Sequence, residues 1–226
     1  MSAPRSLGSF KQVGTGLCFI LFPLVFVFAF STHPGLLHPR FLSPPELIAR
    51  ARGAGALQFG HALVTLATAL LVVVAVHFMK VLEPGSGAWA GFLGAVLAVP
   101  GALALAADKG ALCLTMSSLD GLTDAEFSNM MPGLLALFEK RGWLVLLWGI
   151  VLLPIGFGIQ AVGLLKSKSL PRWQSLLFLV GVLLIATPDG VEMVNLTAAV
   201  LLAIAFVPYG IRLIREGGQQ VAASAA

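Results

Sequence analysis

Apolar runs long enough to cross a membrane constrain this chain more than any other feature. A hydrocarbon layer about 30 Å thick needs roughly 20 apolar helical residues at about 1.5 Å each. Six such runs are separated by short polar breaks, and they lie at residues 14–31, 57–79, 88–107, 143–165, 173–188 and 191–211. A backbone in lipid must satisfy its own hydrogen bonds, so each run is predicted to be a helix. We therefore predict an all-α polytopic membrane bundle of six transmembrane helices, forming one integral-membrane domain over residues 1–226.

The composition supports a membrane protein and argues against a soluble or nucleic-acid-binding one. Apolar residues make up 58% of the chain and charged residues only 11%, whereas soluble domains carry roughly 25% charged residues. The formal net charge is +4, but most basic residues flank apolar runs, where they orient the chain and contact anionic lipid. Membrane lipids are therefore expected partners, and nucleic acid is not.

The distribution of basic residues predicts the orientation. The turn at 166–172 and the tail after Ile211 are basic, whereas the turn at 188–192 contains no Lys or Arg. The positive-inside rule then places both termini in the cytoplasm, with a bacterial inner membrane as the expected location. The first run is long for a signal peptide and no small-residue cleavage site follows it, so we expect an uncleaved span.

Two segments, 32–56 and 108–141, are predicted to lie outside and are too long for simple turns. In the first, Ser43-Pro-Pro-Glu46 is typical of a helix start, which predicts a short helix lying on the membrane surface. In the second, residues 111–116 are apolar enough to extend the third span. Thr123-Asp-Ala-Glu126 then resembles a capping box that opens another short helix.

Prolines and glycines interrupt the spans. Four prolines fall inside predicted helices and are expected to bend them: Pro23, Pro100, Pro154 and Pro208. Glycines gather on spans three and four, where they permit close approach of neighbouring helices. They could serve packing within the chain or contact with another membrane subunit.

Polar side chains on span two share one helical face. Gln58, His61, Thr65 and Thr68 are spaced by three or four residues, beginning at the outer end of the span. A polar stripe in a membrane helix should face protein or water. Hydrogen bonding between helices explains it as well as a solute pathway does, at about 0.6 kcal/mol per contact.

Further ionisable residues lie at the outer ends of spans three and six. Asp189, Glu192 and Asn195 are three apart and share a face; the two carboxylates also suit an N-cap and its N3 partner. Asp108 and Lys109 close the apolar part of span three. Adjacent helical residues point about 100° apart, so we expect no pairing between these two, although Lys109 could reach Asp189 or Glu192.

Together these residues predict a ligand or ion site that opens to the outside, because ionisable groups at membrane depth are costly. Its members are His61, Thr65, Asp108, Lys109, Asp189, Glu192 and Asn195. The site would handle a small solute or ion. Two alternatives remain open: an accessory or structural subunit, as a homo-oligomer or with other membrane proteins, and a membrane-embedded enzyme.

No catalytic residue, metal ligand or cofactor is predicted. The sequence contains no HExxH, Walker loop or CxxC motif, and Cys18 and Cys113 lack metal-ligand spacing. His61 and His77 lie at opposite ends of one span, so they cannot bind one haem together.

The last three spans resemble a known family. Trp143-Leu-Val-Leu-Leu-Trp-Gly-Ile-Val-Leu-Leu-Pro-Ile-Gly156 is followed by Gly163-Leu-Leu-Lys166, Leu170-Pro-Arg-Trp173 and a helix that ends at Pro208-Tyr-Gly-Ile-Arg212. This order over residues 140–212 is similar to a bacterial multi-pass membrane family catalogued as domain of unknown function 4386. The resemblance implies six or seven spans and carries no assigned activity.

Overall fold

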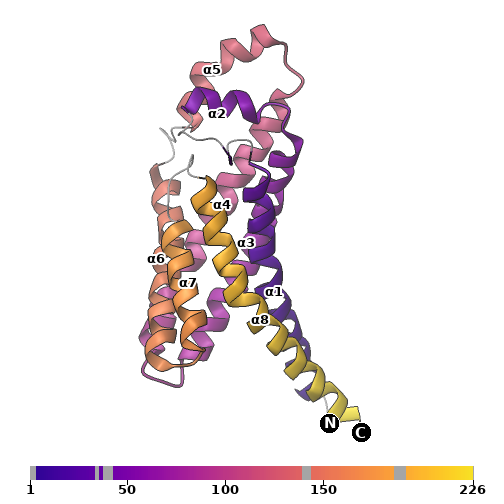
Figure 1. Cartoon of the computed structure of the whole chain (residues 1–226), viewed down its shortest axis with the longest axis vertical. Coiled ribbons are helices and arrows are strands. Elements are labelled where there is room, and N and C mark those ends of the chain that lie inside the picture. The colour runs from indigo at the N-terminus through magenta and orange to yellow at the C-terminus, as the bar shows by residue number, and fades with distance from the viewer. Residues whose placement is uncertain (1–3, 34–35, 38–42, 139–143, 186–191, 226) are drawn as a thin grey trace.

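The computed structural model describes residues 4–33, 36–37, 43–138, 144–185 and 192–225, and every regular element in this part is a helix. The eight helices are α1 (Pro4–Ser31), α2 (Pro44–Ala51), α3 (Gly55–Leu82), α4 (Ala88–Leu119), α5 (Asp124–Phe138), α6 (Leu144–Ser167), α7 (Arg172–Ile185) and α8 (Glu192–Ala225) (Figure 1). The prediction of an all-helical chain is therefore confirmed over the described residues.

Five stretches in these helices are long and apolar enough to cross a membrane. They are Leu7–Ser31, Gly55–Leu82, Ala88–Leu119, Gly149–Ser167 and Glu192–Gln219. The predicted fifth span is described only as α7, whose 14 residues extend about 21 Å at 1.5 Å each. That is less than the roughly 30 Å of hydrocarbon. The described structure is thus compatible with a multi-pass membrane protein and supplies five helices of full spanning length.

The six helices other than α2 and α5 pack side by side in a closed ring. Around this ring α1 contacts α3, α3 contacts α4, α4 contacts α6, α6 contacts α7, α7 contacts α8, and α8 returns to α1. Figure 1 shows both ends of the chain at one end of the bundle, with α2 and α5 beyond the other. We call these the terminal end and the cap end. Helices α1, α4 and α7 run toward the cap end, and α3, α6 and α8 run away from it.

Glycines allow α4 and α6 to approach closely. A Cβ added at Gly94 would lie 2.7 Å from the Gly156 carbonyl oxygen, and one at Gly101 would lie 2.8 Å from the Cβ of Leu153. Neither position can hold a larger side chain without a shift of the neighbouring helix. The glycine-rich faces of these two spans therefore pack against each other.

Gln160 ties three helices together inside the bundle. Its side chain is fully buried, and its Nε2 donates to the carbonyl oxygens of Ala75 in α3, at 2.9 Å, and Gly91 in α4, at 3.1 Å. Because helix backbones already bond within themselves, a side-chain amide is among the few groups that can add polar bonds between apolar helices.

The helices at the cap end form a separate small unit. Helix α4 has 32 residues, about 48 Å at 1.5 Å each, so residues 108–119 do extend the third span. The predicted short helix is present as α2, and its apolar face packs against α5. Ile48, Leu119, Phe127 and Leu134 make a small core of their own. We call α2, α5 and the last turns of α4 the cap.

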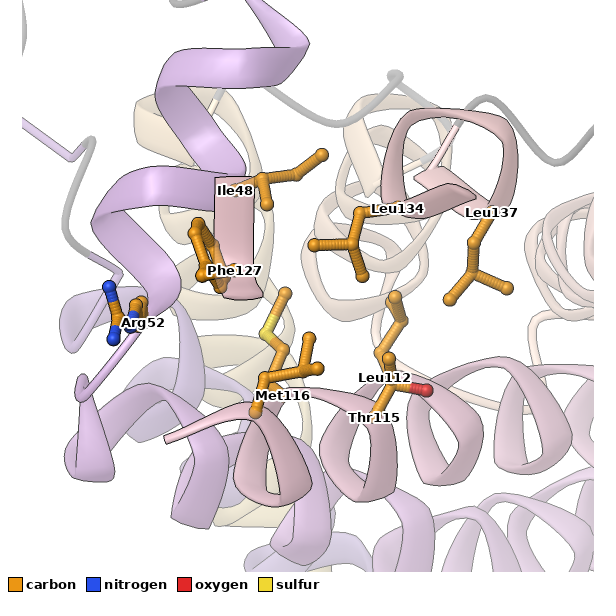
Figure 2. Close-up of a pocket in the computed structure, with 9 residues that line it drawn as sticks. Ile48, Arg52, Leu112, Thr115, Met116, Phe127, Leu134 and Leu137 are labelled. Carbon is orange, nitrogen blue, oxygen red and sulfur yellow. The ribbon is translucent and has the colours of Figure 1, made fainter. Parts of the chain in front are cut away.

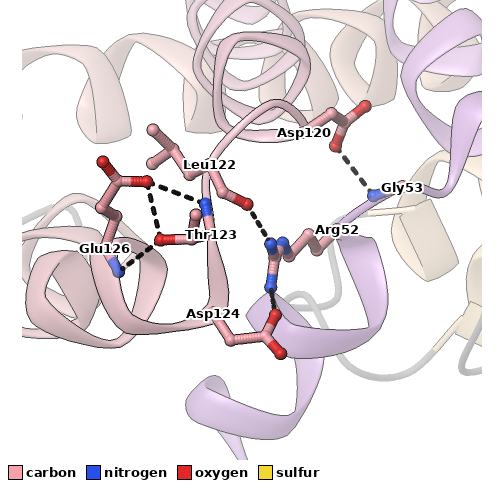
Figure 3. A network of polar contacts seen from close by, with 7 residues as sticks. All are labelled: Arg52, Gly53, Asp120, Leu122, Thr123, Asp124 and Glu126. Atoms are coloured by element: carbon pink, nitrogen blue, oxygen red, sulfur yellow. Dashed lines mark hydrogen bonds and ion pairs between the residues drawn. The ribbon is translucent and has the colours of Figure 1, made fainter.

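Polar contacts join the end of α4 and the start of α5 to the segment between α2 and α3 (Figure 3). Arg52 donates to the Asp124 carboxylate at 2.7 Å and to the Leu122 carbonyl oxygen. Asp120 accepts from the Gly53 backbone N–H at 2.8 Å and from the Gln58 amide at 2.7 Å. These hydrogen bonds and the Arg52 charge lower the pKa of Asp120 below its ordinary 3.8.

The predicted helix start at Ser43 and the predicted capping box at Thr123 are both confirmed at the starts of the two cap helices. The Ser43 backbone N–H donates to the Glu46 carboxylate at 2.9 Å. The Thr123 backbone N–H donates to the Glu126 carboxylate at 2.8 Å, and the Glu126 N–H donates back to the Thr123 hydroxyl at 3.3 Å. Bonds from Thr123 lower the pKa of Glu126 from its ordinary 4.5.

Candidate functional site

The ring of helices encloses one cavity of about 390 Å³, which every helix of the ring helps to line. Ligand sites of roughly 300–1,000 Å³ commonly form between the helices of bundles. The cavity therefore has the size and position of a small-molecule site.

Polar side chains gather at the cap end of this cavity. They come from four segments: His33 follows α1, His61 lies in the second turn of α3, Asp108 and Lys109 lie late in α4, and Glu192 and Asn195 begin α8. The up-and-down course of the helices explains this gathering, because α1 ends where α3 and α8 begin.

Three of these residues are deeply buried: Asp108 is 5% exposed, Glu192 6% and Asn195 5%. His33 Nε2 lies 3.4 Å from Glu192 Oε1, and Lys109 Nζ lies 3.4 Å from Asp108 Oδ2. The expectation that Asp108 and Lys109 would not pair was wrong. The lysine side chain is long and flexible enough to reach its neighbour despite the 100° between their Cα–Cβ directions.

The structure brings together five of the seven residues predicted for the site: His61, Asp108, Lys109, Glu192 and Asn195 all line the cavity. Thr65 is not among the lining residues, and its hydroxyl donates to the His61 carbonyl oxygen at 2.9 Å in the same helix. Asp189 lies outside the described residues. Ligand or ion binding by these residues stays a prediction.

Two neighbours of Thr65 in the predicted polar stripe also serve other contacts. Thr68 donates to the Thr65 carbonyl oxygen at 2.6 Å. Gln58 donates to Asp120 in the cap. The stripe on span two is therefore used mainly for local and cap contacts, and only His61 from it reaches the cavity.

Phenylalanine rings line the rest of the cavity. Phe22, Phe26 and Phe30 come from α1, and Phe157, Phe178 and Phe206 come from α6, α7 and α8. The sequence offered one signal for this, because the three α1 rings are spaced by four residues and so share a helical face. The rings on the other helices have no such pattern, and we did not predict them.

Four of these rings close the cavity toward the terminal end. The ring centroids of Phe178 and Phe206 lie 4.8 Å apart, those of Phe22 and Phe206 5.5 Å, and those of Phe157 and Phe178 5.7 Å. We call Phe22, Phe157, Phe178 and Phe206 the aromatic floor. The pairs of Phe178 with Phe206 and of Phe157 with Phe178 are edge-to-face, and the pair of Phe22 with Phe206 is tilted. Aromatic contacts at such distances give a well-packed layer.

A second polar group lies beyond the aromatic floor. His77 Nε2 and Tyr209 Oη are 2.7 Å apart, and the Arg212 guanidinium lies 4.9 Å from the centre of the Tyr209 ring. Glu216 is 3.7 Å from Arg212 and accepts a bond from Gln12 at 3.0 Å. None of these residues lines the cavity.

The cap contains a smaller pocket, shown in Figure 2. It measures about 30 Å³ and lies among Ile48, Arg52, Met116 and Phe127. One water molecule occupies about that volume in the liquid. This pocket is therefore too small to be a ligand site.

No protein-family model, curated protein or solved structure matches the chain. The resemblance of residues 140–212 to a bacterial multi-pass family stays a prediction. Within the described residues, no group of three or more His, Cys, Asp or Glu side chains is placed to hold a metal ion.

Proposed function

We propose that this chain is a bacterial inner-membrane protein that handles a small solute or ion through the cavity between its helices. In this proposal the chain spans the membrane six times with both termini in the cytoplasm, and the polar end of the cavity faces outward. The observation that carries it is the cavity itself, which is lined by all the helices of the ring and has its polar side chains at one end.

The energetic cost of these polar side chains supports a binding role. Ionisable groups at membrane depth are rare and usually line a pathway or a site. Here Asp108 and Glu192 are each more than nine-tenths buried and line a cavity of ligand size. Polar groups converging in an otherwise apolar pocket are the usual form of a small-molecule site.

A break in the backbone pattern of α6 supports the same proposal. Pro154 has no N–H, so it cannot bond the carbonyl oxygen of Ile150 four residues earlier. Both residues line the cavity. Transport proteins often place interrupted helices at their binding sites, because a carbonyl oxygen released from the helix can bind a solute.

The alternative of an accessory subunit has less support. This alternative rested on the idea that the glycine-rich faces of spans three and four contact another protein. In the structure these two faces pack against each other. No contact among the described residues favours the enzyme alternative. The proposed relationship to the bacterial multi-pass family agrees with the topology and adds no activity.

Cysteine labelling tests the proposal. In a background with Cys18→Ala and Cys113→Ala, Asn195→Cys places a thiol on the cavity wall, and Leu66→Cys places one on an outward position that is 72% exposed. A charged, membrane-impermeant methanethiosulfonate added outside intact cells should modify Asn195→Cys and leave Leu66→Cys unmodified. Na⁺, K⁺, glycine, octanoate and octyltrimethylammonium are then tested as protectants. Absence of labelling at Asn195→Cys, or labelling that no member of this panel slows, overturns the proposal.

A further inference from the structure

We infer that the cavity takes a small lipophilic cation, whose charge lies between Asp108 and Glu192 and whose apolar body lies against the phenylalanine rings. This inference rests on the proposed function, because it names the class of ligand for the same site. Three independent properties of the cavity support it: the charge of its polar end, the chemistry of its walls and its volume.

The charge of the polar end favours a cation. The described lining contains two carboxylates, Asp108 and Glu192, and one ammonium, Lys109, so it carries one net negative charge while His33 and His61 are neutral. Both carboxylates are withdrawn from water, where Coulombic attraction is much stronger than at a surface. Asp108 already contacts Lys109, and Glu192 contacts His33, each at 3.4 Å. A bound cation adds further attraction to both carboxylates, whereas they repel a bound anion.

The walls favour a cation with an apolar body. Beyond the polar end the lining is aliphatic and aromatic, and rings from four helices face the cavity, among them Phe26 and Phe178. The face of a phenyl ring is electronegative, so it attracts an ammonium group and repels a carboxylate. A methylene chain gains about 0.8 kcal/mol per buried CH₂ on such walls, which a bare inorganic cation cannot gain.

The volume sets the size of the ligand. A cavity of about 390 Å³ equals roughly 13 water molecules at 30 Å³ each. Octyltrimethylammonium, with twelve non-hydrogen atoms, matches this volume and has one charge at one end. Octanol and octanoate have the same chain with a neutral or an anionic head, and tetramethylammonium has the head without the chain.

Titration of the full-length protein in lipid nanodiscs with these four probes tests the inference, with empty nanodiscs subtracted for partitioning into lipid. Octyltrimethylammonium should bind at least tenfold more tightly than each of the other three. Glu192→Gln should weaken its binding about tenfold, since hydrogen bonds and ion pairs to charged groups contribute this much. Phe26→Leu should weaken it about threefold through the lost ring contact. Glu216→Gln removes a carboxylate outside the cavity and should leave binding unchanged.

Fold integrity is checked by size-exclusion elution and thermal unfolding of each variant, and Asn195→Ala replaces Glu192→Gln if the latter does not fold. Preference for octanoate or octanol, with dependence on the cavity residues, overturns the ligand class but leaves the proposed function standing. Equal binding of octyltrimethylammonium to the wild type and to both cavity variants also overturns the inference, because the probe then binds elsewhere. Failure of all four probes overturns it too, and the labelling experiment above decides separately whether the cavity takes any solute.

Discussion

His33 Nε2 lies 3.4 Å from Glu192 Oε1. This contact joins the segment that follows α1 to the first residue of α8, two helices that pack along each other from the cap end to the terminal end (Figure 1). It therefore ties two walls of the cavity together at the polar end, where a solute would enter in the proposed function.

Replacing His33 with alanine should loosen this end of the cavity. His33 Nε2 is within ion-pair distance of the Glu192 carboxylate, and polar contacts to charged groups contribute about 1.5–3 kcal/mol; the Glu192 side chain is 6% exposed. We expect His33→Ala to lower the unfolding temperature and to speed labelling of Asn195→Cys, with His33→Gln recovering part of both. Ser31→Ala is the control, because the Ser31 hydroxyl bonds only locally, to the Phe28 carbonyl oxygen at 2.7 Å. Unchanged labelling in His33→Ala would show that the contact does not hold the two helices together.

The cap should loosen in acid. Bonds from Gln58 and Gly53 lower the pKa of Asp120 in the folded protein below its ordinary 3.8. A carboxyl group with a depressed folded pKa contributes stability above its unfolded pKa and loses it as the pH falls through the folded value. The protection factors of the α2 amides, which correct for the pH dependence of intrinsic exchange, should therefore fall below about pH 4, while those of the α6 amides stay constant.

The variant Asp120→Asn serves as the control for this pH effect. It should show low protection factors in α2 already at neutral pH, and it should abolish most of their further fall on acidification. A full acid response in this variant would assign the loosening to another carboxylate, with Glu126 as the next candidate because its pKa is also lowered.

The sequence predicted the local features of this fold well, because their causes are local. The helix start at Ser43 and the capping box at Thr123 follow from residues three apart. The end of α3 and the start of α4 lie close to residues 79 and 88, the limits that hydropathy predicts. The gathering of His61, Asp108 and Glu192 at one end follows from the alternating direction of the spans. These features could be predicted because each depends only on where a residue lies along its own helix.

Other features depend on side-chain direction and helix neighbours, which the sequence does not reveal. Nothing in the sequence shows that α8 packs beside α1, so the contact of His33 with Glu192 could not be predicted. The aromatic floor could not be predicted either, because it combines rings from four helices whose arrangement the sequence does not show. The sequence also could not show that the Thr65 hydroxyl bonds to the backbone of its own helix, at 2.9 Å, and that Thr65 is not among the residues that line the cavity.

At position 160, a neutral replacement should reduce the stability of the protein much less than a charged one. Gln160→Leu loses two interhelical bonds, at about 0.6 kcal/mol each in membrane proteins, and gains apolar contact, so the unfolding temperature should fall only slightly. Gln160→Glu places a carboxylate at a fully buried position. An uncompensated buried charge costs about 3–5 kcal/mol, so this variant should be much less stable or fail to accumulate. Thermal unfolding of the purified proteins measures both, and equal stability of the two variants would contradict the buried position of the side chain.

The packing of α4 against α6 can be tested with a matched pair of substitutions in α6, Gly156→Ala and Gly158→Ala. A Cβ at Gly156 would lie 2.9 Å from the Ala98 Cα, whereas a Cβ at Gly158 would meet nothing within 4 Å. Gly156→Ala must therefore push the two helices apart and should destabilise the protein by about 1–3 kcal/mol. Gly158→Ala should be neutral or stabilise by up to about 1 kcal/mol, since alanine favours a helix more than glycine does. Thermal unfolding of the two variants in the same detergent is the measurement. If Gly156 instead faced a second subunit, Gly156→Ala would change the oligomeric state on size-exclusion chromatography and leave the stability of the monomer near that of Gly158→Ala.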